Sequence, residues 1–204
     1  DEQTIFVFTS DNGPTYDRLG GSDSEFFDSA GPLRGFKGSI YEGGIRVPLL
    51  VRWPGRIPAG AVSDLPCAFY DWMPTLMELV GAPETTPAEC DGLSFAPTFL
   101  GQADRQQRHE FLVWEFPGYT GQQAVRMGDW KGVRRNLVRL GRQTDSGEPP
   151  MELYNLKTDI GETQDLAAEH PEIVATIAAI MLRERTVSAE FPLPALDRLT
   201  VPID

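Results

Sequence analysis

The sequence predicts an α/β segment followed by a small antiparallel sheet that packs with one helix. In the first half of the chain, two short apolar runs precede two helical patterns. Strand-like runs then follow one another without intervening helices, which is typical of an antiparallel meander. A strongly amphipathic helix closes the series. The change lies near residue 105, so we expect two domains, residues 1–105 and 106–204.

The first half is expected to contain two buried strands joined by a long loop. "TIFVFTS" (4–10) is a nearly continuous apolar run, the pattern of a strand buried on both faces. "PLLVRWP" (48–54) is a second short buried strand, bounded by prolines. The residues 13–45 between them are rich in Gly, Ser and Asp and have no clear period. Loops of this length inside a compact domain are usually functional.

Two helical stretches follow the second strand. Residues 68–83 carry apolar side chains at helical spacing and end with Gly81 and Pro83. Pro74 lies inside this stretch, so the helix must start near it or bend there. Residues 91–101 indicate another short helical piece.

The second half changes to strands. Three runs, 109–116, 122–136 and 151–156, are strand-like and separated by turn residues. Residues 171–185 form the clearest helical pattern, with a proline in the first turn and one apolar stripe. The proline-rich tail, 187–204, is expected to wrap the surface.

Charge excludes one broad class of function. The 204-residue chain holds 18 basic and 30 acidic residues, a formal net charge of −12. Nucleic-acid binding requires a basic face, so we expect no nucleic-acid partner. No stretch reaches the roughly 18 apolar residues of a membrane span.

Two locally basic segments interrupt this acidic chain and fit a small anionic ligand better than a polyanion. Solvated surface is the alternative for any one of these cations. The segment 30–60 contains Arg34, Lys37, Arg46, Arg52 and Arg56, and the segment 126–142 contains Arg126, Lys131, Arg134, Arg135, Arg139 and Arg142.

"FVFTSDNGP" (6–14) places a carboxylate and a carboxamide directly after a strand. Gly13-Pro14 turns the chain, so that Asp11 and Asn12 can serve one site. Sites in open α/β sheets form outside the carboxyl ends of strands. Both side chains offer oxygen, which suits Ca²⁺, with Mg²⁺ as the alternative metal. An Asx turn that merely ends the strand is the other interpretation.

"GPLRGFKGSIYEGGIRVPLLVRWPG" (31–55) is a glycine-rich loop that carries Arg34 and Lys37 and leads into the second strand. Glycines allow a backbone to approach a ligand closely. A lysine in such a loop is a mobile point charge suited to a tetrahedral oxyanion, although a solvated side chain is the commoner role.

Several motifs in order give this sequence a specific resemblance that reaches to about residue 185. "FTSDNGP", "LRGFKGSIYEGGIRVPLLVRWPG", "DWMPTLMELVGAP" and "DGLSFAPTFLG" resemble the C-terminal half of the arylsulfatase family. "AVRMGDWKGVR" and "ELYNLKTDIGETQDLAAEHPEI" resemble the small C-terminal subdomain of the same family. The resemblance implies the C-terminal part of an alkaline-phosphatase-like α/β core, followed by an antiparallel sheet packed with a terminal helix.

The resemblance also implies roles for residues of both motifs. Asp11 and Asn12 match the family's late pair of calcium ligands, and Lys37 matches the lysine that contacts the substrate sulfate. Residues expected to shape and support the loop are Arg34, Glu42, Gly43 and Gly44. Candidates for contacts with the remainder of the substrate are Tyr16, Asp17, Arg18, Tyr119 and Gln122.

The sequence also departs from the family pattern. The family's nucleophile is a formylglycine made from the Cys or Ser of a C-x-P/A-S-R motif, and neither Cys67 nor Cys90 lies in one. Whether these two cysteines pair is open. The early calcium-binding aspartates, the active-site histidines and the first lysine are absent as well. We therefore expect a piece of a longer enzyme whose N-terminal half is its partner, and we expect the piece alone to be inactive.

The function implied is that of a sulfuric-ester hydrolase acting on a sulfated carbohydrate or an aryl sulfate, exported to the periplasm or secreted. Carbohydrate is favoured by analogy alone. Two alternatives stay open at this point: a related phosphate or phosphonate ester hydrolase, and a non-catalytic anion- or glycan-binding module.

Overall fold

The computed structural model describes residues 2–16, 19–138 and 149–199, and the chain divides into two compact units. The first unit comprises residues 1–9 and 48–110, and the second comprises residues 10–47 and 111–204. The expectation that residues 1–105 and 106–204 form separate domains of an enzyme stays a prediction. Among the helices of the described ranges, none has the length and apolar character needed to cross a bilayer.

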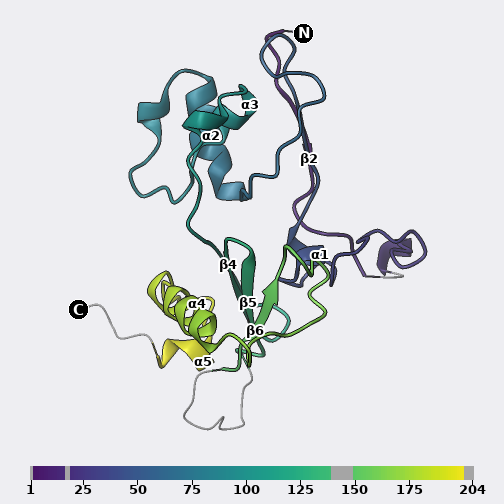
Figure 1. Cartoon of the computed structure of the whole chain (residues 1–204), viewed down its shortest axis with the longest axis vertical. Coiled ribbons are helices and arrows are strands. Elements are labelled where there is room, and N and C mark those ends of the chain that lie inside the picture. The colour runs from purple at the N-terminus through teal and green to yellow at the C-terminus, as the bar shows by residue number, and fades with distance from the viewer. Residues whose placement is uncertain (1, 17–18, 139–148, 200–204) are drawn as a thin grey trace. The chain divides into compact units, whose positions relative to one another are not determined.

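The first unit pairs a two-stranded ladder with a group of short helices (Figure 1). β1 (Phe6–Thr9) runs antiparallel to β2 (Leu49–Arg52). The helical elements are η2 (Phe69–Asp71), α2 (Trp72–Leu79), η3 (Pro83–Thr85), α3 (Ala96–Phe99) and η4 (Ala103–Arg105). Pro74 lies in the first turn of α2, where a proline costs no backbone hydrogen bond, so the helix starts near it as expected.

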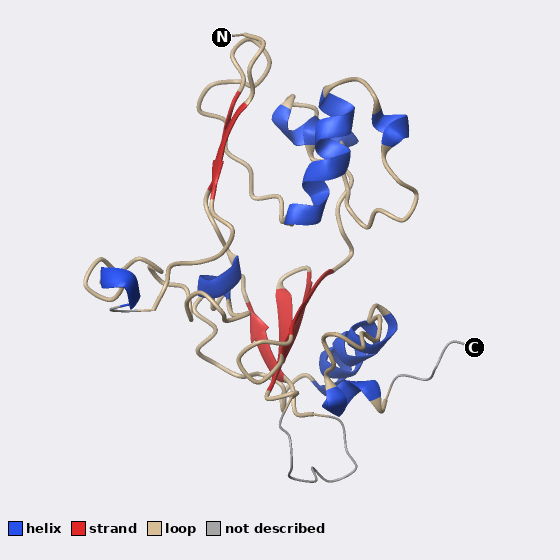
Figure 2. Ribbon diagram, turned by 180° about the vertical axis from the view of Figure 1, so that it is seen from behind, coloured by secondary structure: helices blue, strands red, loops and turns tan. Residues whose placement is uncertain are grey.

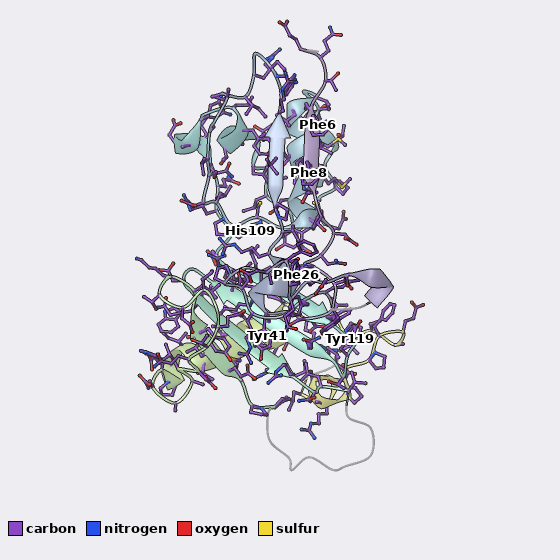
Figure 3. The ribbon with its side chains drawn as sticks, turned by 90° about the vertical axis from the view of Figure 1, so that its right-hand side faces the viewer. Phe6, Phe8, Phe26, Tyr41, His109 and Tyr119 are labelled. Carbon is purple, nitrogen blue, oxygen red and sulfur yellow. The ribbon has the colours of Figure 1, made fainter. Side chains whose placement is uncertain are left out.

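The prediction of two buried strands in this unit is wrong. The exposed fractions of Phe6 and Phe8 are 61% and 56%, and β2 alternates half-buried and exposed side chains. A continuous apolar run indicates burial only where other layers cover both faces of the strand. Within the part of the chain that the structure describes, β1 has β2 as its only ladder partner. Both phenylalanines project from the ladder in Figure 3.

These exposed rings and open strand edges predict self-association of the isolated 204-residue chain. Phe6→Ser combined with Phe8→Ser should shift the chain toward monomer in sedimentation velocity. Phe26→Ser is the matched control, because Phe26 is 77% exposed on a loop of the second unit and lies on no strand edge. A monomeric wild-type chain, or equal effects of both changes, would contradict this prediction.

The second unit is built on the expected antiparallel meander, with strand order β3-β4-β5-β6. Figure 2 shows α4 and α1 flanking this sheet. Its strands are β3 (Leu112–Phe116), β4 (Gln122–Met127), β5 (Trp130–Arg135) and β6 (Glu152–Asn155). Its helical elements are η1 (Leu19–Gly21), α1 (Glu42–Ile45), α4 (Pro171–Arg183) and α5 (Pro194–Asp197).

Alternation along the strands divides the core of the second unit between the two faces of the sheet. Val125 and Leu153 pack with Ile177 and Met181 of α4 on one face. On the other face lies a second cluster that includes residues of the long loop: Ile40, Tyr41, Ala124, Val133, Tyr154 and Leu156. The sheet is therefore the platform against which the loop 31–47 is held.

The tail does more than wrap the surface. Leu193 and Leu196, at the start and within α5, are buried against Leu137. Residues 200–204 of the tail lie outside the described ranges. Both cysteines, Cys67 and Cys90, are free thiols.

Candidate functional site

The Asp11-Asn12 pair lies in a turn that is fixed by its own polar groups. The hydroxyl of Ser10 donates to the carbonyl of Asn12 over 2.8 Å, and the Asn12 amide Nδ2 donates to the carbonyl of Gly13 over 2.9 Å. Asp11 is exposed, and no hydrogen bond or ion pair engages its carboxylate within the described ranges. This carboxylate is consequently open to an external cation.

Close packing of glycines holds this turn against the loop 31–47. The Gly13 amide donates to the carbonyl of Gly44 over 2.9 Å. A Cβ at Gly13 would come within 1.8 Å of the Gly43 carbonyl oxygen, and one at Gly44 within 2.0 Å of the Ser39 carbonyl oxygen. Contacts below 3.0 Å leave no room for a methyl group, so these positions require glycine.

Lys37 lies beside the same turn. Its amide donates to the carbonyl of Pro14 over 2.8 Å. In the sequence Gly35 lies shortly before Lys37 and Gly38 directly after it. Their φ angles of +82° and +86° are left-handed and favour glycine. The Lys37 side chain is exposed. The structure thus brings Lys37 and the Asp11-Asn12 turn onto neighbouring loops joined by two backbone hydrogen bonds.

Arg34 anchors the loop to the sheet. Its guanidinium donates to the Tyr154 hydroxyl and to the Glu162 carbonyl, each over 2.8 Å, and lies 3.9 Å from the centre of the Tyr41 ring. The Arg34 carbonyl in turn accepts the Gly43 amide over 2.7 Å. Arg34 therefore links α1 and β6.

Glu42, at the start of α1, is held by a buried cation between two carboxylates. The Lys131 ammonium lies 2.8 Å from Glu42 Oε1 and 2.9 Å from Glu162 Oε1. Glu162 also accepts the backbone amide of Glu42 over 2.7 Å. Lys131 and Glu162 are both fully buried. We call Glu42, Lys131 and Glu162 the buried triad.

The two carboxylates of the buried triad are shifted in opposite directions. Burial favours the neutral form of Glu42. The charge and hydrogen bond of Lys131, together with the charges of Arg126 and Arg46, outweigh burial and lower the pKa of Glu42. At Glu162 burial is the larger effect and raises the pKa above its ordinary value, despite Lys131. Lys131 lies at nearly the same distance from both carboxylates and attracts both.

A second polar cluster surrounds Glu152 of β6. Tyr41 and Tyr154 both donate their hydroxyls to Glu152 Oε2, the latter over 2.6 Å, and Arg135 donates to Glu152 Oε1 over 2.6 Å. Burial and the hydrogen bond to Glu152 raise the pKa of Tyr154 to about 12. Tyr41, labelled in Figure 3, is 5% exposed and has its pKa raised by burial. Both hydroxyls therefore stay neutral at physiological pH.

The residues expected at the mouth of a substrate site are placed as follows. Tyr16 and Tyr119 line one pocket, with their ring centres 6.5 Å apart. Gln122 also lines it, but its amide is bound to backbone groups of Gly38 and Ile40. Asp17 and Arg18 lie outside the described residues.

Sequence reasoning missed Lys131, Glu162 and Glu152. In the sequence Lys131 belongs to a basic segment. Its partners Glu42 and Glu162 lie 89 and 31 positions away, so its burial has no sign in the neighbouring residues. One signal was available: Lys131 and Val133 share a strand face, so a cation on the core side of β5 requires a buried carboxylate.

Outside these clusters, the first unit contains one ion pair that involves a histidine. His109 Nε2 lies 2.8 Å from Asp71 Oδ1, and Asp71 also accepts the backbone amides of Ala68 and Leu93. Asp71 is 1% exposed and joins three segments, so its role is structural. Among the described residues, no group of three or more His, Cys, Asp or Glu side chains is arranged to hold a metal by itself.

Residues 35–187 match the family described as N-sulphoglucosamine sulphohydrolase, C-terminal. The chain belongs to this sulfatase family. The match covers the Lys37 loop, all four strands of the meander and α4.

Individual proteins similar to this chain are also sulfatases by name. The chain is 31% identical to human arylsulfatase A, covering 92% of this chain and 39% of that protein. It is 30% identical to the N-acetylgalactosamine-6-O-sulfatase of Bacteroides thetaiotaomicron, covering 91% and 37%. The crystal structure of Ps i-CgsB in complex with k-i-k-neocarrahexaose superposes with a TM-score of 0.68 at 28% identity, covering 90% and 36%.

The structural neighbours are sulfatases of the alkaline-phosphatase-like fold, which confirms the predicted fold class. The relatives reported above are sulfatases by name. The chain spans between a third and two fifths of the length of these relatives.

Proposed function

We propose that this chain supplies the C-terminal part of the active site of a sulfatase that hydrolyses sulfate esters of carbohydrates. The longer protein that contains this chain is called the complete enzyme below, and its N-terminal half is the proposed partner. One observation carries the proposal: the Asp11-Asn12 turn and the Lys37 loop are joined by the Gly13–Gly44 and Lys37–Pro14 hydrogen bonds. These bonds put the oxygen donors and the lysine on neighbouring loops, which supports a shared site.

The side chains at this turn fit a share of a calcium site. Asp11 offers a free carboxylate and Asn12 a carboxamide oxygen, the hard donors that Ca²⁺ prefers over zinc. Ca²⁺ takes about 6–8 oxygen ligands, so these two side chains would be completed from the N-terminal half. When bound, the metal would offset negative charge on the sulfate oxygens.

Lys37 has the second role in this proposal. Its ammonium donates to a sulfate oxygen, where charge grows as the ester bond breaks. The nucleophile, a formylglycine by family resemblance, is expected in the N-terminal half of the complete enzyme. Arg34, Glu42, Gly43 and Gly44 act as supports, because they fix the backbone from which Lys37 projects.

A carbohydrate substrate is favoured over an aryl sulfate by the pocket beside Gly38. Its lining combines three tyrosine rings with polar groups such as Ser39 and Asn136. Sugar rings need both an apolar contact and hydrogen-bonding partners, whereas an aryl group needs mainly apolar walls. We also propose that the complete enzyme is exported, where calcium is abundant.

The experiment is to measure released inorganic sulfate by ion chromatography after incubating the complete enzyme with sulfated N-acetylhexosamines. We expect sulfate release that falls when calcium is chelated and returns when it is added back. The corresponding phosphate ester serves as the discriminating substrate. Faster release of phosphate than of sulfate, or no release of either, would overturn the proposal.

A further inference from the structure

The pocket beside Lys37 has features that the hydrolysis of a simple sulfate ester does not require. It has a volume of about 180 Å³, and Gly38, the residue after Lys37, is part of its lining. Its lining residues come from the loop 15–47 and from the meander: Tyr16, Gly38, Ser39, Tyr41, Tyr119, Thr120, Gln122, Arg135 and Asn136.

Three tyrosines line the pocket, and two of them, Tyr16 and Tyr119, form a pair. The Tyr119 ring lies directly on Gly38, where an added Cβ would come within 2.6 Å of it. Tyr16 faces Tyr119 at 6.5 Å with the ring planes inclined by 40°. Rings at this separation form an aromatic pair, and the side of the pair that faces the pocket offers apolar contact to a sugar ring beside Gly38.

The segment that carries Tyr119 is held in an unfavourable backbone conformation. Tyr119 and Thr120 have φ angles of +49° and +76°, and the second is unusual for a β-branched residue. Hydrogen bonds compensate: the Val138 amide donates to the Thr120 carbonyl, and the Thr120 hydroxyl to Asn136 Oδ1. Strain maintained in this way is typical of binding sites, where it fixes a side chain in position.

The pocket has a cation in its lining. Arg135 is the only charged side chain among the described lining residues, and it is 44% exposed. Its neighbour Glu152 is shared with Arg34, at 3.8 Å, so two guanidiniums face one carboxylate. Arg135 donates to Glu152 Oε1 through Nε and Nη2, and the rest of its partly exposed side chain remains accessible in the pocket.

We propose that this pocket binds a saccharide ring bearing a second anionic substituent, a carboxylate or a further sulfate, next to the ester that is cleaved. The inference rests on the proposed sulfatase function and refines its substrate class. The pair of rings, Tyr16 and Tyr119, provides an apolar contact for the sugar ring. Arg135 determines specificity, because a planar guanidinium pairs well with carboxylate or sulfate oxygens.

The test compares three substrates with the complete enzyme: a monosulfated N-acetylhexosamine, the same sugar with a second sulfate, and the monosulfated sugar linked to a uronic acid. The readout is the ratio of kcat/KM for each doubly charged substrate to that for the singly charged one. Arg135→Gln should lower this ratio about tenfold or more for at least one of them, the effect of losing a hydrogen bond between charged groups.

Arg183→Gln is the matched control, since Arg183 is also exposed and paired with a carboxylate but lies on α4, outside the pocket. It should leave the ratio unchanged. The two doubly charged substrates distinguish a sulfate from a carboxylate as the second group. If Arg135→Gln leaves the kcat/KM ratio unchanged for both doubly charged substrates, the pocket assignment is overturned, even when the enzyme retains full sulfatase activity.

Failure of the proposed function is recognised separately. The wild-type complete enzyme would then release no sulfate from any of the three substrates. Calorimetric titration with the disulfated sugar still tests the pocket in that case, and Arg135→Gln should weaken binding about tenfold. Equal affinities of wild type and Arg135→Gln would contradict the inference by this route.

Discussion

Replacing Lys37 with alanine is expected to lower kcat of the complete enzyme by roughly a hundredfold or more. Loss of one donor to a developing oxyanion typically costs this much, because no other group can occupy its position. Residues 31–47 contain no second lysine, so no other ammonium group on this loop can replace that of Lys37. Steady-state kinetics on a sulfated N-acetylhexosamine measures the effect.

Two further variants make this result interpretable. Lys37→Arg should recover only part of the activity, because a planar guanidinium cannot reproduce the geometry of a point charge. Lys157→Ala is the matched control: Lys157 is a lysine of the same unit, its side chain is 74% exposed, and its removal should leave kcat unchanged. Full activity of Lys37→Ala would contradict the assignment of Lys37 to sulfate.

Replacing Lys131 with methionine is expected to cause the largest loss of stability, about 3–5 kcal/mol in the free energy of unfolding. The change leaves Glu42 and Glu162 buried without their shared cation. Because Glu42 begins α1, the loss should spread to the Gly43-Gly44 backbone that holds the Asp11-Asn12 turn. Denaturant unfolding of the complete enzyme measures it.

A double variant separates the charge effect from lost packing. Lys131→Met combined with Glu162→Gln removes one of the two stranded carboxylates and should recover part of the stability. Lys157→Met is the control and should change stability little, since its partner Asp129 is 3.9 Å away and exposed. A double variant no more stable than Lys131→Met would contradict the account of the buried triad.

The stability deficit of Lys131→Met should also depend on pH. In the wild type the lowered pKa of Glu42 contributes stability above the unfolded pKa, and this is lost as pH falls through the folded pKa. In the variant both carboxylates lack the cation, so burial raises their folded pKa values above the unfolded ones. Acidification then favours the folded variant, and its deficit relative to wild type should shrink.

The meander and α4 could be predicted from the sequence because their signals are local. The strand-like runs on either side of the Gly128-Asp129 turn and the proline at the start of α4 each depend on a few adjacent residues. The environment of β1 could not be predicted in this way. Its apolar run says that the strand can be buried, whereas burial itself depends on which layers cover it.

The candidate site likewise contains residues that short motifs indicate and residues whose role depends on distant contacts. Asp11, Asn12 and Lys37 lie in short motifs, and the glycines beside them mark the tight turns that the structure contains. The strand face that Lys131 shares with Val133 indicates only that some carboxylate must be near, and Glu162 carries no local signal. They meet Glu42 through the register of β5 and the turn that holds Glu162 at a φ of +51°. Their role depends on contacts 89 and 120 positions apart, which a single sequence does not show.

The central claim is that Asp11 and Asn12 hold part of a calcium site that the N-terminal half completes. Calorimetric titration with CaCl₂ tests it most directly, on the complete enzyme, on its Asp11→Ala variant and on the isolated 204-residue chain. We predict measurable calcium binding by the complete enzyme, at least about tenfold weaker binding by Asp11→Ala, and weak or no binding by the isolated chain. Asp23→Ala, which removes a carboxylate from the loop of the same unit, is the control and should bind as the wild type does. Equal calcium affinity of wild type and Asp11→Ala, or micromolar affinity of the isolated chain, would contradict the account.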